Sequence, residues 1–315
     1  MPRNGLARMG AAMLVIAMIA GACSKSTPPS TASKGTLAST LVFGAPKDCP
    51  TNKFCQIGLK NTYGIVFKEV RLLDSGGPLT VTALRSGTVQ VGELFSTSIY
   101  DPNFVALVDD KHLEAADYLA PVIRKAKATP DVVALLNGVS SKLTTQNIVP
   151  LNKAFDVDKK GAKSIAKGFL DQNGLLASKT STGTGKSITV GVSGAFEESI
   201  IVAEMYAQVL ENAGYKVKRE LSLGTRPVSD PALFNGQIDV KPEYLASEAQ
   251  HLDPNADITG DPAHNADVLK PLLAAKGVEL LQYSNLLDND VFVVTKATQT
   301  KYNLVNVSDL AKPAP

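Results

Sequence analysis

The stretch Ala83–Gly92, Ala-Leu-Arg-Ser-Gly-Thr-Val-Gln-Val-Gly, recurs 149 residues later as Ala232–Lys241, Ala-Leu-Phe-Asn-Gly-Gln-Ile-Asp-Val-Lys. A proline stands five positions before each copy, at Pro78 and Pro227. The likeness extends upstream, where Leu41-Val-Phe-Gly44 matches Ile188-Thr-Val-Gly191. A repeat of this length exceeds a solenoid unit. It predicts two similar α/β lobes with a ligand between them.

Composition indicates an ordinary globular protein. The chain has 315 residues, of which 44% are apolar and 20% charged, and it is large enough for its core to divide in two. Its formal net charge of +2 comes from Arg3 and Arg8, since the rest of the chain has 30 basic and 30 acidic residues. Because no basic stripe is present, we expect no nucleic-acid partner.

The N-terminus resembles an export signal. Arg3 and Arg8 precede the short apolar stretch 11–19, which is followed by Ala20-Gly-Ala-Cys23. This pattern predicts a signal peptide over residues 1–22, a lipid on Cys23 and a flexible tether over 23–38. A plain secretory signal with an incidental cysteine is the alternative.

The two remaining cysteines, Cys49 and Cys55, lie in one predicted loop. An exported protein can oxidise such a pair, so we expect a disulfide. A metal site would need further ligands, and the histidines are scattered along the chain, at His112, His251 and His264. The sequence therefore predicts neither a metal site nor a cofactor.

Strand-like and helix-like segments alternate along the chain, which predicts mainly parallel sheets flanked by helices. Residues 177–187, rich in Ser, Thr, Gly and Lys, form a predicted linker between the halves. Helix N-termini near Gly76-Gly77 and residues 193–196 are expected to offer free N–H groups to a ligand.

Ligands of such sheets bind beyond the C-terminal ends of the strands. The repeat therefore nominates two pairs of equivalent segments: Gly44–Pro46 with Gly191–Gly194, and Ser96–Ser98 with Pro242–Tyr244. They supply the candidates Ser96, Thr97, Ser193, Glu243 and Tyr244. Tyr244 fits either a ligand contact or a core position. The segment Asp288-Asn-Asp290 fits either a cation site or a turn.

Catalysis has little support in the sequence. The chain contains neither a Gly-x-Ser-x-Gly nor a His-Glu-x-x-His motif, and its histidines have no evident partners for base chemistry. We therefore predict no catalytic residue and no enzyme activity.

Several segments together resemble the substrate-binding proteins of osmoprotectant ABC importers, which bind glycine betaine, choline and carnitine. The likeness covers nearly all of residues 40–311. In the second half it rests on Ile188–Gly191, Glu204–Gln208, Ala213–Tyr215, Pro231–Val240, Pro242–Tyr244 and Val307–Ala311. In the first half it rests on Leu41–Gly44, Leu73–Pro78, Phe95–Thr97, Lys142–Thr145 and Asn173–Leu175.

The order of these segments is exchanged relative to the usual family member, which implies a circular permutation through the 177–187 linker. The resemblance implies a bilobal type II periplasmic-binding-protein fold, with two parallel-rich sheets and a ligand cleft between the lobes. One predicted lobe comprises residues 39–101 plus 291–315, and the other 104–289. The hinge is expected where the chain crosses, near 98–104 and 288–291. A fragment of a tandem fusion is the alternative.

The resemblance also implies site residues. The family holds a quaternary ammonium group in a box of aromatic rings, for which Tyr244, Tyr100 and Phe196 are the candidates. Asn52 stands where many relatives have an arginine, which weakens the case for a ligand carboxylate. Asp288 or Asp290 would instead favour choline or another cation. Lys241 replaces a frequent tyrosine.

The sequence thus predicts a monomeric, lipid-anchored solute-binding protein on the extracytoplasmic face of the cell membrane. It would deliver a small polar solute, a quaternary amine above all, to ABC permease subunits. The alternatives are a different, non-osmolyte ligand, a sensory or scavenging binding protein without a transporter, and an enzyme on the same fold.

Overall fold

The computed structural model describes residues 35–74, 76–192 and 197–315. The predicted signal peptide, Cys23 and nearly all of the predicted tether lie outside these ranges, as do Ser193 and Phe196. Within the described ranges, no helix combines the length and the apolar character that a membrane span requires.

The first lobe is built on a five-stranded sheet. Its core strand β1 pairs in parallel with β2 and with β3, whereas β10 runs antiparallel to β3 and to β4. In spatial order the strands are β2 (Glu69–Leu72), β1 (Val42–Ala45), β3 (Val91–Phe95), β10 (Asp290–Thr295) and β4 (Phe104–Ala106).

The second lobe repeats this plan in a second five-stranded sheet. Here β6 pairs in parallel with β7 and β8, and β5 runs antiparallel to β8 and β9. In order the strands are β7 (Lys216–Glu220), β6 (Ser187–Gly191), β8 (Val240–Tyr244), β5 (Leu119–Arg124) and β9 (Val278–Leu280). The matching order shows that the sequence repeat is a repeat of topology.

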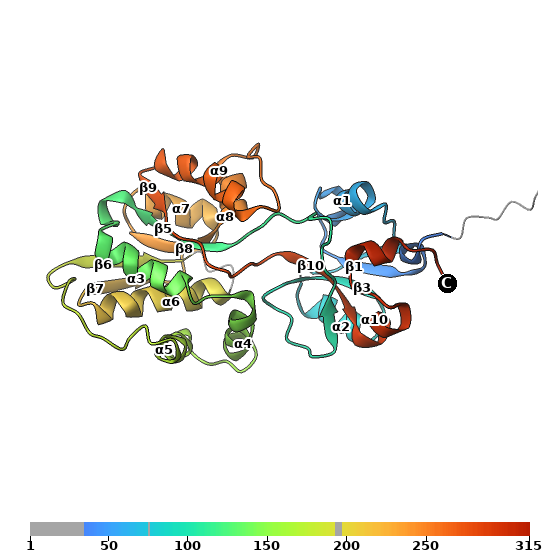
Figure 1. Ribbon diagram of the computed structural model, residues 1–315, viewed down its shortest axis with the longest axis horizontal. Coiled ribbons are helices and arrows are strands. Elements are labelled where there is room, and N and C mark those ends of the chain that lie inside the picture. Colours follow the sequence, from blue (N-terminus) through green and yellow to red (C-terminus); the bar gives the residue numbers. More distant parts are fainter. Residues whose placement is uncertain (1–34, 75, 193–196) are drawn as a thin grey trace, which may run out of the picture. The chain divides into compact units, whose positions relative to one another are not determined.

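Both sheets are mixed, not mainly parallel as the alternation of elements predicted. The reason lies in β5 and β10, which each follow a crossing from the other lobe and enter their new sheet in the reverse direction (Figure 1). The first crossing from one lobe to the other lies between β4 and β5, because β4 still pairs with β10 in the first sheet. The lobe boundary predicted before residue 104 was therefore too early. The second crossing lies between β9 and β10.

The folded part also begins earlier than the predicted tether end at residue 38. Leu37 and Ala38 are buried in the core of the first lobe, and Thr36 bridges Pro313 near the other end of the chain. The backbone N–H of Leu37 donates to the carbonyl of Lys312, and that of Ala314 donates to the carbonyl of Gly35. The two ends of the described body are thus held side by side.

Helices cover both faces of the second sheet. They are required on both because the apolar side chains of β5 point alternately to its two faces. Leu119 and Ile123 belong to one core and Ala120 and Val122 to the other. The first core is completed by α3 (Pro130–Ser140), α4 (Thr145–Asp156), α5 (Ala162–Gln172) and α6 (Glu197–Asn212). The second is completed by α7 (Arg226–Phe234), α8 (Leu245–Leu252) and α9 (Pro262–Ala274).

The first sheet is covered by shorter elements. Its strand β10 alternates in the same way, with Phe292 and Val294 in one core and Val293 in the other. One face packs against the short helices η1 (Leu37–Thr40), η3 (Leu59–Tyr63) and η5 (Val307–Ala311), and α1 (Gln56–Gly58) leads directly into η3. The other packs against α2 (Pro78–Arg85), while α10 (Lys296–Tyr302) follows β10 directly.

Strand β8 runs further than predicted, so Pro242-Glu243-Tyr244 lies within it and not after it. Because side chains alternate along a strand, Glu243 and Tyr244 face opposite sides of the sheet. Tyr244 belongs to the core with α6, whereas Lys241 and Glu243 reach residues of α7. The two neighbours that the sequence grouped as one candidate site are therefore separated.

Lys241 and Glu243 are part of a buried ion cluster. The Lys241 ammonium is fully buried, lies 2.8 Å from Glu243 Oε2 and also contacts the Asp230 carboxylate. Arg226 donates to Glu243 Oε1 at 2.6 Å and lies 3.2 Å from Glu248. Burial alone would raise the pKa of Glu243, but the attraction of Lys241 and Arg226 outweighs it and holds that pKa at about 2.

We expect Lys241→Met to lower the free energy of unfolding by about 3 to 5 kcal/mol, because it removes the buried ammonium from Asp230 and leaves Glu243 with Arg226 alone. Denaturant unfolding at neutral pH measures the loss. The control is Lys218→Met, which breaks an ion pair with Glu220 whose lysine is 71% exposed, and it should cost no more than about 1 kcal/mol. Equal losses in the two variants would contradict a structural role for the buried cluster.

Candidate ligand-binding site

A cavity of about 210 Å³ lies beside the ends of β3 and β8. This volume is below the roughly 300–1,000 Å³ of pockets for drug-sized ligands, so it suits a small solute. The lining comes from the loop before α1, both crossings, the end of β3, the start of β10 and α8. The residues are Phe54, Phe95, Glu114, Ala115, Asp117, Tyr244, Ala246, Ser247, Gln250, Ile258, Asp288, Asn289 and Asp290.

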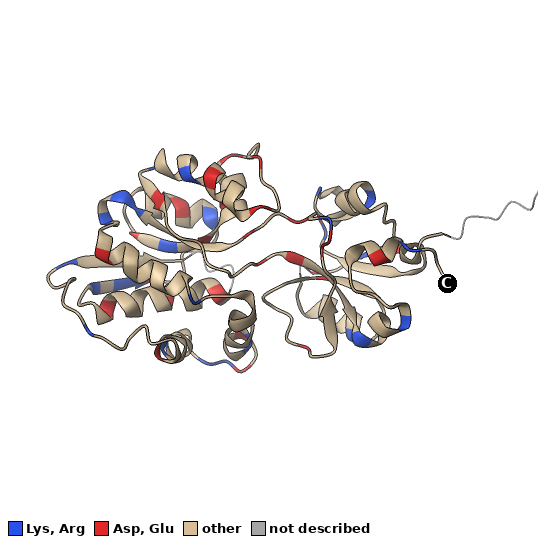
Figure 2. Ribbon diagram, viewed as in Figure 1, with Lys and Arg blue, Asp and Glu red and all other residues tan. Residues whose placement is uncertain are grey.

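The lining is strongly acidic. It includes four carboxyl groups, those of Glu114, Asp117, Asp288 and Asp290, and none of the described lining residues is a lysine or arginine. Figure 2 shows acidic residues along both crossings. The cavity is therefore an electrostatic environment for a cation.

Three aromatic rings, those of Phe54, Phe95 and Tyr244, line the same cavity. The faces of such rings attract ammonium groups. The ring of Phe54 already has a cation over it, the Lys53 ammonium at 4.8 Å from the ring centroid. The Lys53 side chain is exposed and is not part of the lining.

Asp117 is held by the first turn of α8. Its Oδ1 accepts hydrogen bonds from the backbone N–H of Ala246 at 2.7 Å and of Ser247 at 3.1 Å, and the Ser247 hydroxyl donates to its Oδ2. Burial raises the pKa of Asp117, and these bonds together with Arg226 partly offset the rise. A carboxylate near a helix N-terminus is favoured by the free N–H groups and the helix dipole.

Asp288 belongs to a hydrogen-bonded network that joins residues of the two lobes. The Thr97 hydroxyl donates to Asp288 at 2.8 Å, and the Tyr244 hydroxyl donates to Glu198 at 2.5 Å. The Asn152 amide donates to Glu198 at 2.9 Å and to the Thr97 carbonyl at 3.3 Å. Burial and the nearby Glu198 carboxylate raise the pKa of Asp288 well above its ordinary value.

Glu114, Asp290 and Glu93 form a second group of carboxyls around the cavity. Burial, followed by repulsion from neighbouring carboxylates, raises the pKa of Asp290 to about 6, of Glu93 to about 8 and of Glu114 to about 10. Removal from water and like charges both disfavour an ionised carboxylate. At neutral pH this group therefore retains protons.

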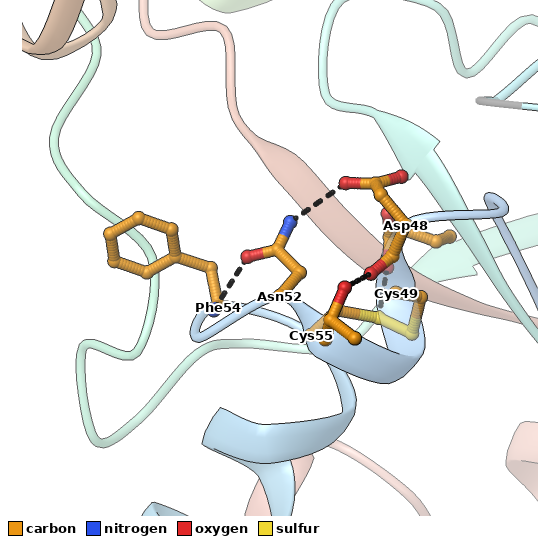
Figure 3. Close-up of a disulfide and its surroundings, with 7 residues drawn as sticks. Asp48, Cys49, Asn52, Phe54 and Cys55 are labelled. Atoms are coloured by element: carbon orange, nitrogen blue, oxygen red, sulfur yellow. Dashed lines mark hydrogen bonds between the residues drawn. A yellow bond between two sulfur atoms is a disulfide. The ribbon is translucent and has the colours of Figure 1, made fainter. Parts of the chain in front are cut away.

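A disulfide joins Cys49 to Cys55 in the loop that carries Phe54 (Figure 3). Glu93 Oε2 lies 2.9 Å from the Cys55 sulfur. A disulfide sulfur has no proton, so in any hydrogen bond here the protonated Glu93 is the donor. Asn52 is occupied within the loop, where its amide donates to Asp48 at 3.2 Å and its oxygen accepts from the Phe54 backbone at 2.9 Å.

The structure distributes the other predicted residues as follows. Ser96 donates to the Leu287 carbonyl at 3.0 Å and accepts from the Asn289 backbone at 3.0 Å, so it braces the second crossing. Tyr100 lines a different cavity of about 830 Å³, which shares Phe95 with the first. Tyr244, Asp288 and Asp290 are thus brought together, Thr97 supports them, and Asn52, Tyr100 and Glu243 lie apart.

The N-terminus of α2 does not offer free N–H groups to a ligand, contrary to prediction. The carboxylate of Asp74 accepts from the backbone of Leu79 at 2.8 Å and of Thr80 at 2.9 Å. Burial would raise the pKa of Asp74, but these hydrogen bonds and that of the Thr80 hydroxyl lower it below its ordinary value.

Several lining residues were not predicted, among them Phe54, Glu114, Asp117 and Gln250. For Glu114 and Asp117 the signal was indirect: Leu119 pairs with Tyr244, so the residues before β5 lie beside the C-terminal end of β8. A search for sites after parallel strands alone overlooks the residues before an antiparallel one.

We expect Glu93→Gln to flatten the dependence of stability on pH. The folded state holds the Glu93 proton up to about pH 8, whereas the unfolded chain releases it at lower pH, so the free energy of unfolding falls as pH rises between these values. The slope is at most about 1.4 kcal/mol per pH unit for one group. Denaturant unfolding from pH 5 to pH 8 measures it.

Glu69→Gln, at an exposed glutamate that pairs with Arg71, is the matched control and should leave the profile unchanged. Parallel profiles for wild type and Glu93→Gln would show that Glu93 does not hold its proton.

Known proteins resemble this chain in sequence and, more weakly, in structure. A Helicobacter pylori protein named ergothioneine transport permease/ergothioneine binding protein EgtU is 28% identical over 137 residues, which are 42% of this chain and 24% of that protein. The match thus spans about a quarter of the relative's length.

Two solved structures show fainter likeness. The periplasmic domain of Bordetella pertussis BvgS is 13% identical, with a TM-score of 0.45, over 88% of this chain and 41% of that one. The Bacillus subtilis protein YckB is 13% identical, with a TM-score of 0.42, over 86% of this chain and 83% of that one.

The family described as the substrate binding domain of the ABC-type glycine betaine transport system matches residues 34–172 and 186–315. These two segments contain all ten strands of the two sheets and every described residue that lines the cavity. The chain belongs to this family of ABC-transporter substrate-binding domains.

Proposed function

We propose that this protein captures a small quaternary amine in the 210 Å³ cavity and delivers it to the permease subunits of an ABC importer. The observation that carries the proposal is the combination of aromatic rings and carboxyl groups in one small cavity. The rings can face the methyl groups of a quaternary ammonium, and the carboxyls balance its charge. No covalent step is required.

Family membership supports the transport role, and the sequence likeness to a protein named for ergothioneine adds a second candidate ligand. Glycine betaine follows from the family description, and choline follows from the aromatic and acidic lining of the cavity. The ligand panel for any binding experiment therefore includes ergothioneine beside choline, glycine betaine and carnitine.

We also propose that the halves are circularly permuted. The family match is interrupted at residues 173–185, which overlap the predicted 177–187 linker. The paired ends at Thr36 and Pro313 support this, because permutation is tolerated where chain ends lie close together on the surface. The lobes would then comprise residues 36–106 plus 290–315, and residues 119–280.

We expect Phe54→Leu to weaken binding of the best quaternary amine by about 5- to 30-fold, since it removes a ring face but keeps an apolar side chain. Calorimetric titration of the folded body measures the effect. The control is Phe155→Leu. Phe155 lies on α4, packs against a core of the second lobe and does not line the cavity, so this variant should bind as wild type does. Unchanged affinity in Phe54→Leu would remove this ring from the site.

The extracytoplasmic protein is proposed to be anchored by a lipid on Cys23. We expect Cys23→Ser to abolish incorporation of labelled fatty acid and to move the protein from the membrane fraction to the soluble fraction. The double variant Cys49→Ser, Cys55→Ser removes the other two cysteines, which form the disulfide, and should keep the label. Membrane retention and labelling of Cys23→Ser would show that Cys23 is not the anchor.

A further inference from the structure

The charge of the cavity narrows the class of solute that it accepts. We propose that the site selects solutes with a net positive charge and no carboxylate, so that a simple cation binds in preference to a zwitterion of the same size. The inference rests on the proposed function, because it concerns the same cavity.

The first support is the set of charges that act on the lining. The charged groups that bear on Glu114 are Asp290, Glu93 and Asp109, and those that bear on Asp290 are Asp48 and Asp117. All of them are acidic. A cation between these groups relieves their mutual repulsion, whereas a second anion adds to it.

The second support is the shortage of positive groups for a ligand carboxylate. Arg226 acts on Asp117 but is bonded to Glu243 and lies 3.2 Å from Glu248, on the α7 and α8 face of the sheet. Lys53 is exposed over Phe54. Within the described lining, the donors left for a carboxylate are neutral, chiefly the amides of Gln250 and Asn289. Neutral donors hold a carboxylate less strongly than an arginine does.

Capture of a cation should also release protons. Glu114 and Asp290 face Glu93 from β3, Asp48 from the disulfide loop, and Asp109 and Asp117 from the first crossing. Because burial and repulsion keep some of these carboxyls protonated, a bound positive charge favours their ionised forms. Affinity for a cation therefore rises with pH, above all between about 6 and 8, where Asp290 and Glu93 ionise.

The test uses four probes in a two-by-two design, with the folded protein and calorimetric titration at pH 7. Choline and ethanolamine are cations with and without the methyl groups. Glycine betaine and glycine are the corresponding zwitterions. The comparison of cations with zwitterions tests the charge inference, and the comparison of methylated with unmethylated probes tests the proposed function. Titrations in buffers of different ionisation enthalpy count the protons released.

We expect choline to bind at least tenfold more tightly than glycine betaine, with proton release. Glycine betaine binding as tightly as choline would overturn the inference and leave the proposed function intact. Ethanolamine binding more tightly than choline, with both zwitterions weak, would uphold the inference and overturn the quaternary-amine function. No binding of any of the four probes would overturn both.

Asp290→Asn provides the residue-level test, because it removes one charge at nearly constant shape. It should weaken choline binding about tenfold, reduce the preference over glycine betaine and lower the number of protons released. Asp267→Asn removes the charge of an exposed residue on α9 and serves as the control. An unchanged choline preference in Asp290→Asn would contradict the assigned role of the carboxyl cluster.

Discussion

The antiparallel insertion of β5 and β10 is the constraint on which the rest of the structure depends. Each strand arrives from the other lobe and is held by two neighbours, β5 by β8 and β9, and β10 by β3 and β4. The four acidic residues of the cavity lie just before β5 or at the start of β10. Because β5 pairs within the second sheet and β10 within the first, carboxyl groups that are more than 170 residues apart in the chain come together.

Such a group of carboxyls is costly to the empty protein. Buried like charges are tolerated here because some keep their protons and others are held by hydrogen bonds, as Asp288 is by Thr97 and Asp117 by α8. The contrast with Lys241 and Arg226 is informative, since the buried carboxylates of α7 and β8 have cations as partners. No lysine or arginine stands among the described residues that line the cavity, so this part of the molecule departs from a rule that the ion cluster keeps.

The sequence predicted those parts that depend on local pattern. The repeat gave the correct expectation of two similar α/β lobes, and the alternation of strand-like and helix-like segments gave the correct expectation of sheets flanked by helices. The direction of β5 and β10 was missed, because strand pairing such as Leu119 with Tyr244 joins distant residues and leaves no local signature. The same gap explains why Asp117, just before β5, was not predicted. Glu243 lies apart from Tyr244 for another reason, because β8 extends to Tyr244 and its side chains alternate between the two faces of the sheet.

Asp117 has a consequence of its own for recognition. Its carboxylate lines the cavity and at the same time closes the first turn of α8, so its position is set by the backbone and not by the ligand. Under the proposed function, an incoming cation meets a carboxyl group that is already oriented, and little side-chain freedom is lost when the two come together. The proposed site is thus preorganised by a helix that would need this carboxyl group even if no solute ever bound.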